Sequence, residues 1–363
     1  MTPAPREVGT SHLAILARAP RPAGSAAEAA ARDYAERVLD EAGFTVRRER
    51  FEYSRFPGFY ATPIGGALLA AVILASATFA LGGAPHAAMA VLLVGTVAVA
   101  AFASAMLGDA VLTLPWQRTW GENLVATWGS ETPRVWLVAH LDSKSQPVPT
   151  LARVAGILLL AGATALALAA GVLQLAALPH RTAWWVAVAL VVVGAPAVVA
   201  SVVGARSDGA VDNASGVAAV LAAAVSVRPE KMFGVLLPSA EELGLAGSRA
   251  WARGARRGTA LNCDGVDDAG ELTIMYSGAA PTPLIQTLQA LAPGSCRVRR
   301  LPLGLLTDSV ALAERRWTTV TVSRGSFATL RRVHTPADSL AALRGDGIDE
   351  VATVLARAVE ALA

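Results

Sequence analysis

The sequence is poor in charge and in cysteine, and both shortages narrow the range of functions. Charged residues make up 16% of the 363 residues, whereas soluble domains usually carry about a quarter. The net charge is only +3, and no cluster of Lys and Arg is interleaved with aromatic residues, which argues against a nucleic-acid partner. Cys263 and Cys296 are the two cysteines. They are too few for a disulfide framework, and they form no CxxC metal-binding motif.

Hydrophobic residues, 54% of the chain with a mean hydropathy of +0.47, are concentrated in two blocks. No charged residue lies in the segment Phe56–Gly108. Its apolar runs Ile64–Gly82 and Ala87–Leu107 each have about the 20 residues that cross a bilayer core. A second pair, Ala155–Leu178 and Ala183–Ala205, has the same character. Because a short turn joins each pair, we predict two transmembrane hairpins, with buried core helices as the alternative.

A hairpin leaves and re-enters on one side of a membrane, so the rest of the chain is expected on a single face. Five basic residues flank the spans on that face: Arg55, Arg118, Lys144, Arg153 and Arg206. The far turns contain only Arg181. The positive-inside rule therefore predicts an integral plasma-membrane protein with a cytoplasmic globular part, and membrane lipid as a partner. Residues 1–22 lack a continuous apolar segment, so we expect no secretory signal peptide.

The remaining segments, 1–58, 109–150 and 207–363, are predicted to form one discontinuous domain, with residues 59–108 and 151–206 as the two inserted hairpins. Strands and helices alternate within them. The predicted strands are 44–51, 122–128, 134–140, 232–237, 259–264, 271–276 and 317–323. The first is charged and is expected at a sheet edge. The pattern predicts the α/β class, with a mixed, largely parallel sheet flanked by helices.

Five segments of this domain end an apolar strand, or leave a loop, with a side chain that binds metal. The candidates are His140 with the nearby Asp142, Asp212, the Glu241-Glu242 pair, Asp264 and His334. His and carboxylate ligands suit zinc, and two metals bridged by one carboxylate suit hydrolysis. Each segment alone also has an ordinary structural explanation, such as a turn and N-cap at Asp212. Because adjacent carboxylates repel, a cation is expected beside Glu241 and Glu242.

Together these segments resemble the dizinc exopeptidases of the aminopeptidase Y and glutamate carboxypeptidase type. The matching motifs are His140-Leu-Asp142, Asp212-Asn-Ala-Ser-Gly216, Glu241-Glu-Leu-Gly-Leu245, Asn262-Cys-Asp264 and His334-Thr-Pro-Ala-Asp338. Pro20-Arg-Pro-Ala-Gly-Ser25 also fits the start of the family's sequences. The resemblance covers residues 14–58, 119–146 and 207–363, and it implies the zinc-exopeptidase fold of the phosphorylase/hydrolase-like type. The two hairpins are then insertions into loops of that fold.

The resemblance implies a peptide substrate and two Zn²⁺ ions, with Co²⁺ or Mn²⁺ as alternatives. Asp212 would bridge the two ions. His140 and Asp264 would complete one site, and Glu242 and His334 would complete the other.

The resemblance also implies two catalytic positions and a backbone feature. Glu241 would be the general base that takes a proton from water and passes it to the leaving amine. Asp142 would orient His140, since the partner of a ligating histidine is often a carboxylate. A cis peptide bond would join Asp212 to Asn213.

This chain departs from the family pattern at two places. Thr307-Asp-Ser309 stands where Ser-Asp-His is common, and Val333 stands where a tyrosine often precedes the last histidine. If that tyrosine holds the oxyanion, another donor is needed here. Asp267 and Asp268 are expected in a solvated loop, with contact to a substrate α-amine as the alternative. Asp338 is expected to hold the His334 loop.

We therefore expect a membrane-anchored, zinc-dependent exopeptidase, with an aminopeptidase favoured over a carboxypeptidase. One alternative is a glutaminyl cyclase-like acyltransferase with one zinc, against which the retention of all five ligand residues argues. The other is a non-catalytic metal-binding membrane scaffold, against which the retention of Glu241 argues. The motifs identify neither the substrate nor the oligomeric state.

Overall fold

The protein is described by a computed structural model that covers residues 5–129, 132–178, 180–228, 230–302 and 304–363. Its internal contacts divide the chain into two compact units. The globular unit comprises Met1–Arg55, Val111–Ser145 and Gly204–Ala363, and the helical unit comprises Phe56–Ala110 and Gln146–Val203. Each unit is described by itself below.

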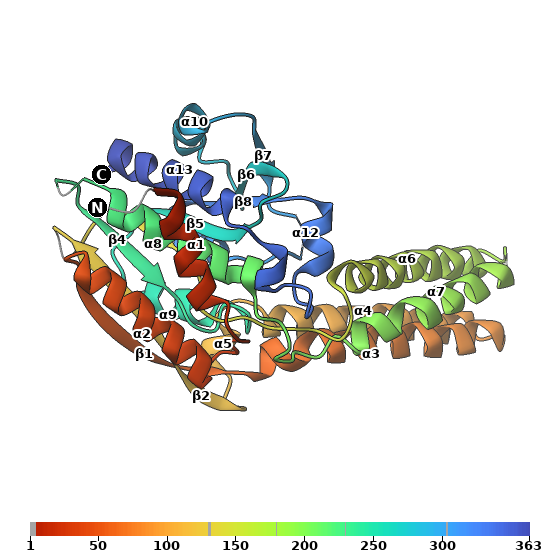
Figure 1. The fold of residues 1–363 in the computed structure, drawn as a ribbon. Helices are drawn as coiled ribbons and strands as arrows, with labels where there is room; N and C mark the ends of the chain where they lie inside the picture. Colours follow the sequence, from red (N-terminus) through yellow and green to blue (C-terminus); the bar gives the residue numbers. More distant parts are fainter. Residues whose placement is uncertain (1–4, 130–131, 179, 229, 303) are drawn as a thin grey trace. The chain divides into compact units, whose positions relative to one another are not determined.

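One mixed sheet organises the globular unit (Figure 1). Among the described residues its strands are β1 (Thr45–Ser54), β2 (Arg118–Trp128), β3 (Val135–Val138), β4 (Phe233–Leu237), β5 (Thr259–Val266), β6 (Glu271–Tyr276), β7 (Cys296–Arg300) and β8 (Thr318–Gly325). Their spatial order is β1-β2-β4-β3-β5-β8-β6-β7. The central strands β4, β3, β5 and β8 run parallel to one another, and they pair antiparallel with β2 on one side and with β6 on the other. The predicted α/β class is confirmed, and β1 lies at a sheet edge as its charges predict.

Helices cover both faces of this sheet. They are α1 (Pro5–Leu16), α2 (Ala26–Glu41), α5 (Ala110–Thr113), α8 (Ser215–Ser226), α9 (Ala246–Gly254), α10 (Thr282–Leu291), α11 (Asp308–Glu314), α12 (Phe327–Arg332) and α13 (Asp346–Leu362), with the short turns η1 (Ala210–Ala214) and η2 (Leu340–Ala342). Leu137 of β3 packs into the larger core, which contains residues of α1, α2, α8 and α13. Its neighbours Trp136 and Val138 pack into a smaller core with Trp251 of α9 and Leu312 of α11. Because successive side chains of a strand face opposite ways, the unit forms three layers.

The helical unit is built from α3 (Phe56–Leu81), α4 (Pro85–Met106), α6 (Thr150–Leu175) and α7 (Arg181–Val199). These are the helices among the described residues that are long and apolar enough to cross a membrane. Small residues let α6 and α7 pack closely. Gly156 of α6 faces Gly194 of α7 so tightly that a Cβ atom at Gly156 would lie only 2.6 Å from the Gly194 carbonyl oxygen. A polar contact also joins three helices: Gln174 donates to the Ala80 carbonyl and accepts from the Trp184 indole.

The observed elements differ from the predicted ones in a few places. Helix α3 begins at Phe56, before the predicted apolar run at Ile64, because the aromatic segment that precedes this run is itself helical. Strand β7 was not predicted, since its sequence Cys-Arg-Val-Arg-Arg lacks the apolar alternation of a half-buried strand and it lies at the outer edge of the sheet. The short helix α12 was also missed.

Candidate metal centre

The candidate ligands converge because three neighbouring parallel strands end at one edge of the sheet. His140 follows β3, the Glu241-Glu242 pair follows β4, and Asp264 lies near the end of β5. In open α/β sheets the carboxyl ends of the strands are where ligands bind. Asp212 comes from η1, which leads into α8, and His334 comes from the loop after α12. The fold thus brings together all five predicted segments.

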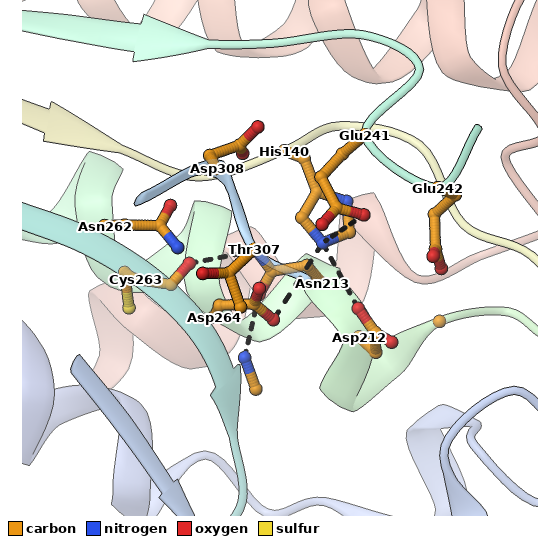
Figure 2. A network of polar contacts seen from close by, with 12 residues as sticks. His140, Asp212, Asn213, Glu241, Glu242, Asn262, Cys263, Asp264, Thr307 and Asp308 are labelled. Atoms are coloured by element: carbon orange, nitrogen blue, oxygen red, sulfur yellow. Dashed lines mark hydrogen bonds and ion pairs between the residues drawn. The ribbon is translucent and has the colours of Figure 1, made fainter. Parts of the chain in front are cut away.

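Two groups of ligand atoms form at this edge. One contains His140, Glu241 and Asp264, the other contains Asp212, Glu242 and His334, and within each group the atoms lie within 4.8 Å of one another. Asp212 joins the groups, since its Oδ1 is 3.2 Å from His140 Nε2 and its Oδ2 is 2.9 Å from His334 Nε2. Figure 2 shows Asp212, Glu241 and Asp264 around the His140 ring, whose Nε2 is 3.9 Å from Asp264 Oδ1.

The donor atoms fit a bound metal ion. His140 Nε2 and Glu242 Oε1 are buried and make no well-aligned hydrogen bond among the described residues, although each faces another candidate ligand atom, Asp212 Oδ1 at 3.2 Å and His334 Nε2 at 3.3 Å. A buried polar atom that makes no hydrogen bond is destabilising, and a cation between the facing nitrogen and oxygen atoms would satisfy both. Imidazole nitrogen and carboxylate oxygen are zinc donors. Cys263 belongs to neither group, and burial raises the pKa of its thiol.

Asp142 supports this centre in a way that differs from the predicted contact. His140 Nδ1 is 3.0 Å from the backbone oxygen of Asp142, whereas the Asp142 carboxylate lies 3.7 Å away. A carbonyl accepts only if Nδ1 carries the proton, which leaves a lone pair on Nε2 for a metal. The Asp142 carboxylate accepts hydrogen bonds from the backbone N–H groups of Glu241 and Glu242, at 3.0 and 3.2 Å. One residue therefore positions both neighbouring ligand segments.

The cation beside the acid pair is Lys144, which the sequence marks only as a basic residue near a membrane span. Its Nζ lies 2.5 Å from Glu242 Oε2. Burial is the largest single influence and raises the pKa of Glu242, but the Lys144 ammonium and His334 together lower that pKa to about 2. Burial raises the pKa of Glu241 well above its ordinary range, although His140 acts in the opposite direction. The two adjacent acids thus differ in proton affinity, which is a common feature of functional sites.

Asn213 holds the backbone on both sides of Asp264. Its Nδ2 donates to the Cys263 carbonyl at 2.9 Å, and its Oδ1 accepts from the Gly265 N–H at 3.2 Å. The implied cis peptide bond between Asp212 and Asn213 is present. Gly216 packs directly against the Asn213 amide, where a Cβ atom would clash. The turn that carries Asp212 is therefore locked to the strand that carries Asp264.

Asn123 of β2 plays a corresponding part for the Glu241-Glu242 loop. Its Oδ1 accepts from the Ser239 N–H at 3.1 Å, and its Nδ2 donates to the Gly247 carbonyl at 2.9 Å. These two contacts close the loop at its start and its end. The supporting role of neither asparagine side chain was identified from the sequence, because each acts on backbone groups far away in the chain.

Asp338 and Arg21 fix the turn that carries Asp212. Asp338 accepts hydrogen bonds from the N–H groups of Val211 and Asp212, at 2.6 and 3.2 Å, so it ties the His334 loop to that turn. Arg21 is buried and donates to the Leu141 carbonyl at 2.9 Å and to the Asp208 carbonyl at 2.7 Å. Arg21 lies in the Pro20–Ser25 motif, which was the available signal for its role.

The expectation of a solvated loop at Asp267 was wrong. Asp267 is 1% exposed and accepts hydrogen bonds from Thr329, at 2.5 Å, and from Arg332 of α12. It therefore anchors the helix that precedes His334. Asp268 accepts backbone hydrogen bonds at the start of α13, including one from Gly347 at 3.1 Å.

The Thr307-Asp-Ser309 segment forms a buried polar cluster. Asp308 accepts a hydrogen bond from Ser248 at 2.5 Å, and burial raises the pKa of Asp308 to about 6. The hydroxyl groups of Thr307 and Ser309 bond to each other and to Thr321. Figure 2 shows Thr307 and Asp308 close to the ligand residues. Ser309, which stands where the family pattern often has a histidine, is thus part of a cluster of hydroxyl groups.

Comparison with known proteins agrees with this geometry. The sequence profile described as peptidase family M28 matches residues 123–359, more than half of the chain. The chain belongs to peptidase family M28. This membership confirms the resemblance to the dizinc exopeptidases at the level of the family. No curated protein sequence matches the chain significantly.

Several solved structures share the M28 chain's fold at low sequence identity. An aminopeptidase from Aneurinibacillus sp. strain AM-1 is 14% identical, with a TM-score of 0.57 over 98% of this chain and 93% of that one. A zinc aminopeptidase from Bacillus subtilis is 15% identical, with a TM-score of 0.57 over 100% and 96%. A glutaminyl cyclase from Porphyromonas gingivalis is 14% identical, with a TM-score of 0.56 over 98% of both chains. At this identity the likeness concerns the fold alone.

Proposed function

We propose that the protein is a membrane-anchored, zinc-dependent exopeptidase that acts as an aminopeptidase on a terminal peptide bond. The observation that carries the proposal is the pair of ligand groups joined by Asp212, with Glu241 beside them. Membership of family M28 supports a metallopeptidase. Two aminopeptidases among the structures of similar fold, one of them a zinc aminopeptidase, support the aminopeptidase direction.

In this proposal Asp212 is shared by two metal positions. His140 and Asp264 complete the first position, and Glu242 and His334 complete the second. The nitrogen and oxygen donors favour Zn²⁺, with Co²⁺ or Mn²⁺ as alternatives. When bound, the metal ions would lower the pKa of a water molecule and polarise the scissile carbonyl.

Glu241 is the proposed proton carrier. Its side chain is 5% exposed, and its Oε2 lies 3.9 Å from His140 Nε2. Burial raises the pKa of Glu241, which increases the affinity of its carboxylate for a proton, as a general base requires. It would take the proton of the attacking water and deliver it to the leaving amine. The hydrogen bond from its backbone N–H to Asp142 holds it in place.

We further propose that the helical unit spans the plasma membrane as two hairpins, within residues 59–108 and 151–206, with the globular unit in the cytoplasm. Its helices have the length and hydropathy of membrane spans. Apolar side chains such as Val94 and Val193 are 71% and 68% exposed, and lipid would cover them. The excess of flanking basic residues supports the orientation.

Cysteine labelling tests this orientation. A His86→Cys variant places a thiol at the start of α4, next to the turn that joins it to α3, and a membrane-impermeant maleimide should label it in intact cells. The native Cys296 in the globular unit should react only after the cells are opened. Labelling of Cys296 in intact cells would contradict a cytoplasmic globular unit.

A substrate panel tests the activity itself. The full chain, purified in detergent and loaded with zinc, is incubated with free, N-acetylated and C-terminally amidated peptides and with peptides that begin with glutamine. Release of the first amino acid from free and amidated peptides supports an aminopeptidase. Release of the last amino acid from N-acetylated peptides would show a carboxypeptidase instead.

A glutaminyl cyclase-like acyltransferase is the second candidate, because the Porphyromonas gingivalis glutaminyl cyclase has a similar fold. Its signature in the same panel is cyclisation of N-terminal glutamine without release of an amino acid. No turnover of any peptide by the folded, zinc-loaded protein would contradict both enzymatic candidates and would favour a scaffold.

A further inference from the structure

Lysine is rare in this chain, and one of the few lysines lies in the metal centre. Only two of the 31 basic residues are lysines, Lys144 and Lys231. Lys144 Nζ is 2.5 Å from Glu242 Oε2, and the Lys144 side chain is 16% exposed. Lys231 lies elsewhere on the surface, where its Nζ donates to the Ala363 carbonyl at 2.9 Å. The two lysines therefore form a natural pair of test and control residues.

The Lys144 ammonium makes the two ligand groups electrostatically unequal. Each group contains two carboxylates and one histidine. Lys144 pairs with Glu242 in the group of Asp212, Glu242 and His334. Among the described residues, no Lys or Arg forms an ion pair with Glu241 or Asp264. The group around Glu242 thus carries one unit less of net negative charge.

We propose that Lys144 is a built-in competitor for the metal ion at Asp212, Glu242 and His334, so that this position binds its ion more weakly than the position at His140 and Asp264. The ammonium occupies a ligand oxygen of Glu242 and repels an incoming divalent cation. This inference rests on the proposed metallopeptidase function, because it assumes that both groups bind metal.

The chemistry of lysine suits this role better than that of arginine. An ammonium is a compact point charge on a flexible stem, so it can occupy one oxygen of Glu242 and then withdraw when a metal ion arrives. A guanidinium would hold a carboxylate through a planar, two-pronged contact that is harder to displace. A competing explanation is that Lys144 only orients Glu242 as a ligand. The two explanations predict opposite effects of removing the charge.

The test measures zinc affinity directly. The metal-stripped full chain in detergent is titrated with Zn²⁺ against a chromophoric chelator. We expect two affinities in the wild-type protein that differ by about tenfold or more, because a unit charge at contact distance is weakly screened in a partly buried site. His334→Ala should remove the weaker of them. Lys144→Met should raise the weaker affinity by about tenfold and leave the tighter one unchanged.

Three matched variants sharpen the result. Lys144→Gln should behave like Lys144→Met, and it replaces the latter if that variant does not fold. Lys144→Arg retains the charge and should retain the difference between the two affinities. Lys231→Met removes the other lysine and should change neither affinity.

The outcomes separate this inference from the proposed function. If Lys144→Met and Lys144→Gln bind zinc no more tightly than wild type at the weaker position, Lys144 is not a competitor. Two equal affinities in the wild-type protein would also overturn the inference while leaving the metallopeptidase proposal intact. A folded wild-type chain that binds no zinc at either position would overturn the proposed function itself.

Discussion

Replacing Asn213 with alanine tests whether the geometry of the centre is set by residues that do not bind metal. The Asn213 side chain is fully buried, and its amide satisfies the Cys263 carbonyl and the Gly265 N–H on either side of Asp264. The alanine variant leaves both backbone groups without these partners. A buried polar group that loses its hydrogen bond costs about 1–3 kcal/mol.

The expected loss in the free energy of unfolding is therefore about 2–6 kcal/mol, a large part of the 5–15 kcal/mol that stabilises a typical protein. Because Asp264 also loses its support, zinc affinity should fall by about 10–100-fold. Asn213→Asp is the conservative comparison. The aspartate keeps an acceptor for the Gly265 N–H, but its second oxygen faces the Cys263 carbonyl oxygen and repels it. The Asn213→Asp variant should therefore also be less stable than wild type.

Denaturant unfolding followed by tryptophan fluorescence gives the stability, and chelator competition gives the zinc affinity. Asn123→Ala is the matched control, because it also removes two buried backbone contacts but acts on the Glu241-Glu242 loop. Both alanine variants should lose similar stability. The Asn213→Ala variant could instead unfold within about 0.5 kcal/mol of wild type, the range of an ordinary surface substitution, and bind zinc with unchanged affinity. That result would refute the claim that Asn213 supports the metal centre.

Three further predictions concern other parts of the molecule. Gln174→Leu breaks the contact that joins α3, α6 and α7 and should destabilise the helical unit by about 1 kcal/mol. Thermal unfolding in detergent measures the effect. Thr78→Val is the control, because the Thr78 hydroxyl donates to the Leu74 carbonyl within α3. Burial lowers the pKa of His12 to about 4 from 6.5, so the unfolded chain takes up a proton first and stability falls as the pH drops from 6.5 toward 4. Between pH 7.5 and pH 5, wild type should lose about 2 kcal/mol more than His12→Gln in denaturant unfolding; equal losses would show that His12 does not titrate in this way. Removal of bound metal with a chelator should lower the melting temperature. Zinc added back at about 100 times its dissociation constant should raise the free energy of unfolding by about 2.7 kcal/mol. A melting temperature that responds to neither treatment would argue against metal binding.

The ligand segments could be predicted from the sequence because they follow simple local patterns. His140, Glu241 and Asp264 each lie at the end of a buried apolar strand, and parallel strands place such residues at a common edge. The apolar runs of the helical unit were equally visible from composition. These features depend on hydrophobic periodicity and strand order, which the order of residues records directly.

The supporting contacts could not be predicted because they depend on loop paths and side-chain rotamers. Nothing in the local sequence of Asn213 indicates that its amide reaches the backbone beside Asp264. Lys144 reads as a basic residue that follows a strand, and only the folded loop brings it to Glu242. Asp267 was misjudged for the same reason, since its burial is created by α12, a short helix without a strong sequence pattern.

The most direct test of the central claim is the turnover of the zinc-loaded Glu241→Gln variant on the best peptide of the panel. Glutamine keeps the size of the side chain but cannot accept and release the proton. The proposed mechanism predicts that zinc content stays at the wild-type level, while kcat falls by about 10²–10⁴-fold. A Glu241→Gln variant that retains its zinc and turns over at the wild-type rate would contradict the assignment of Glu241 as the proton carrier.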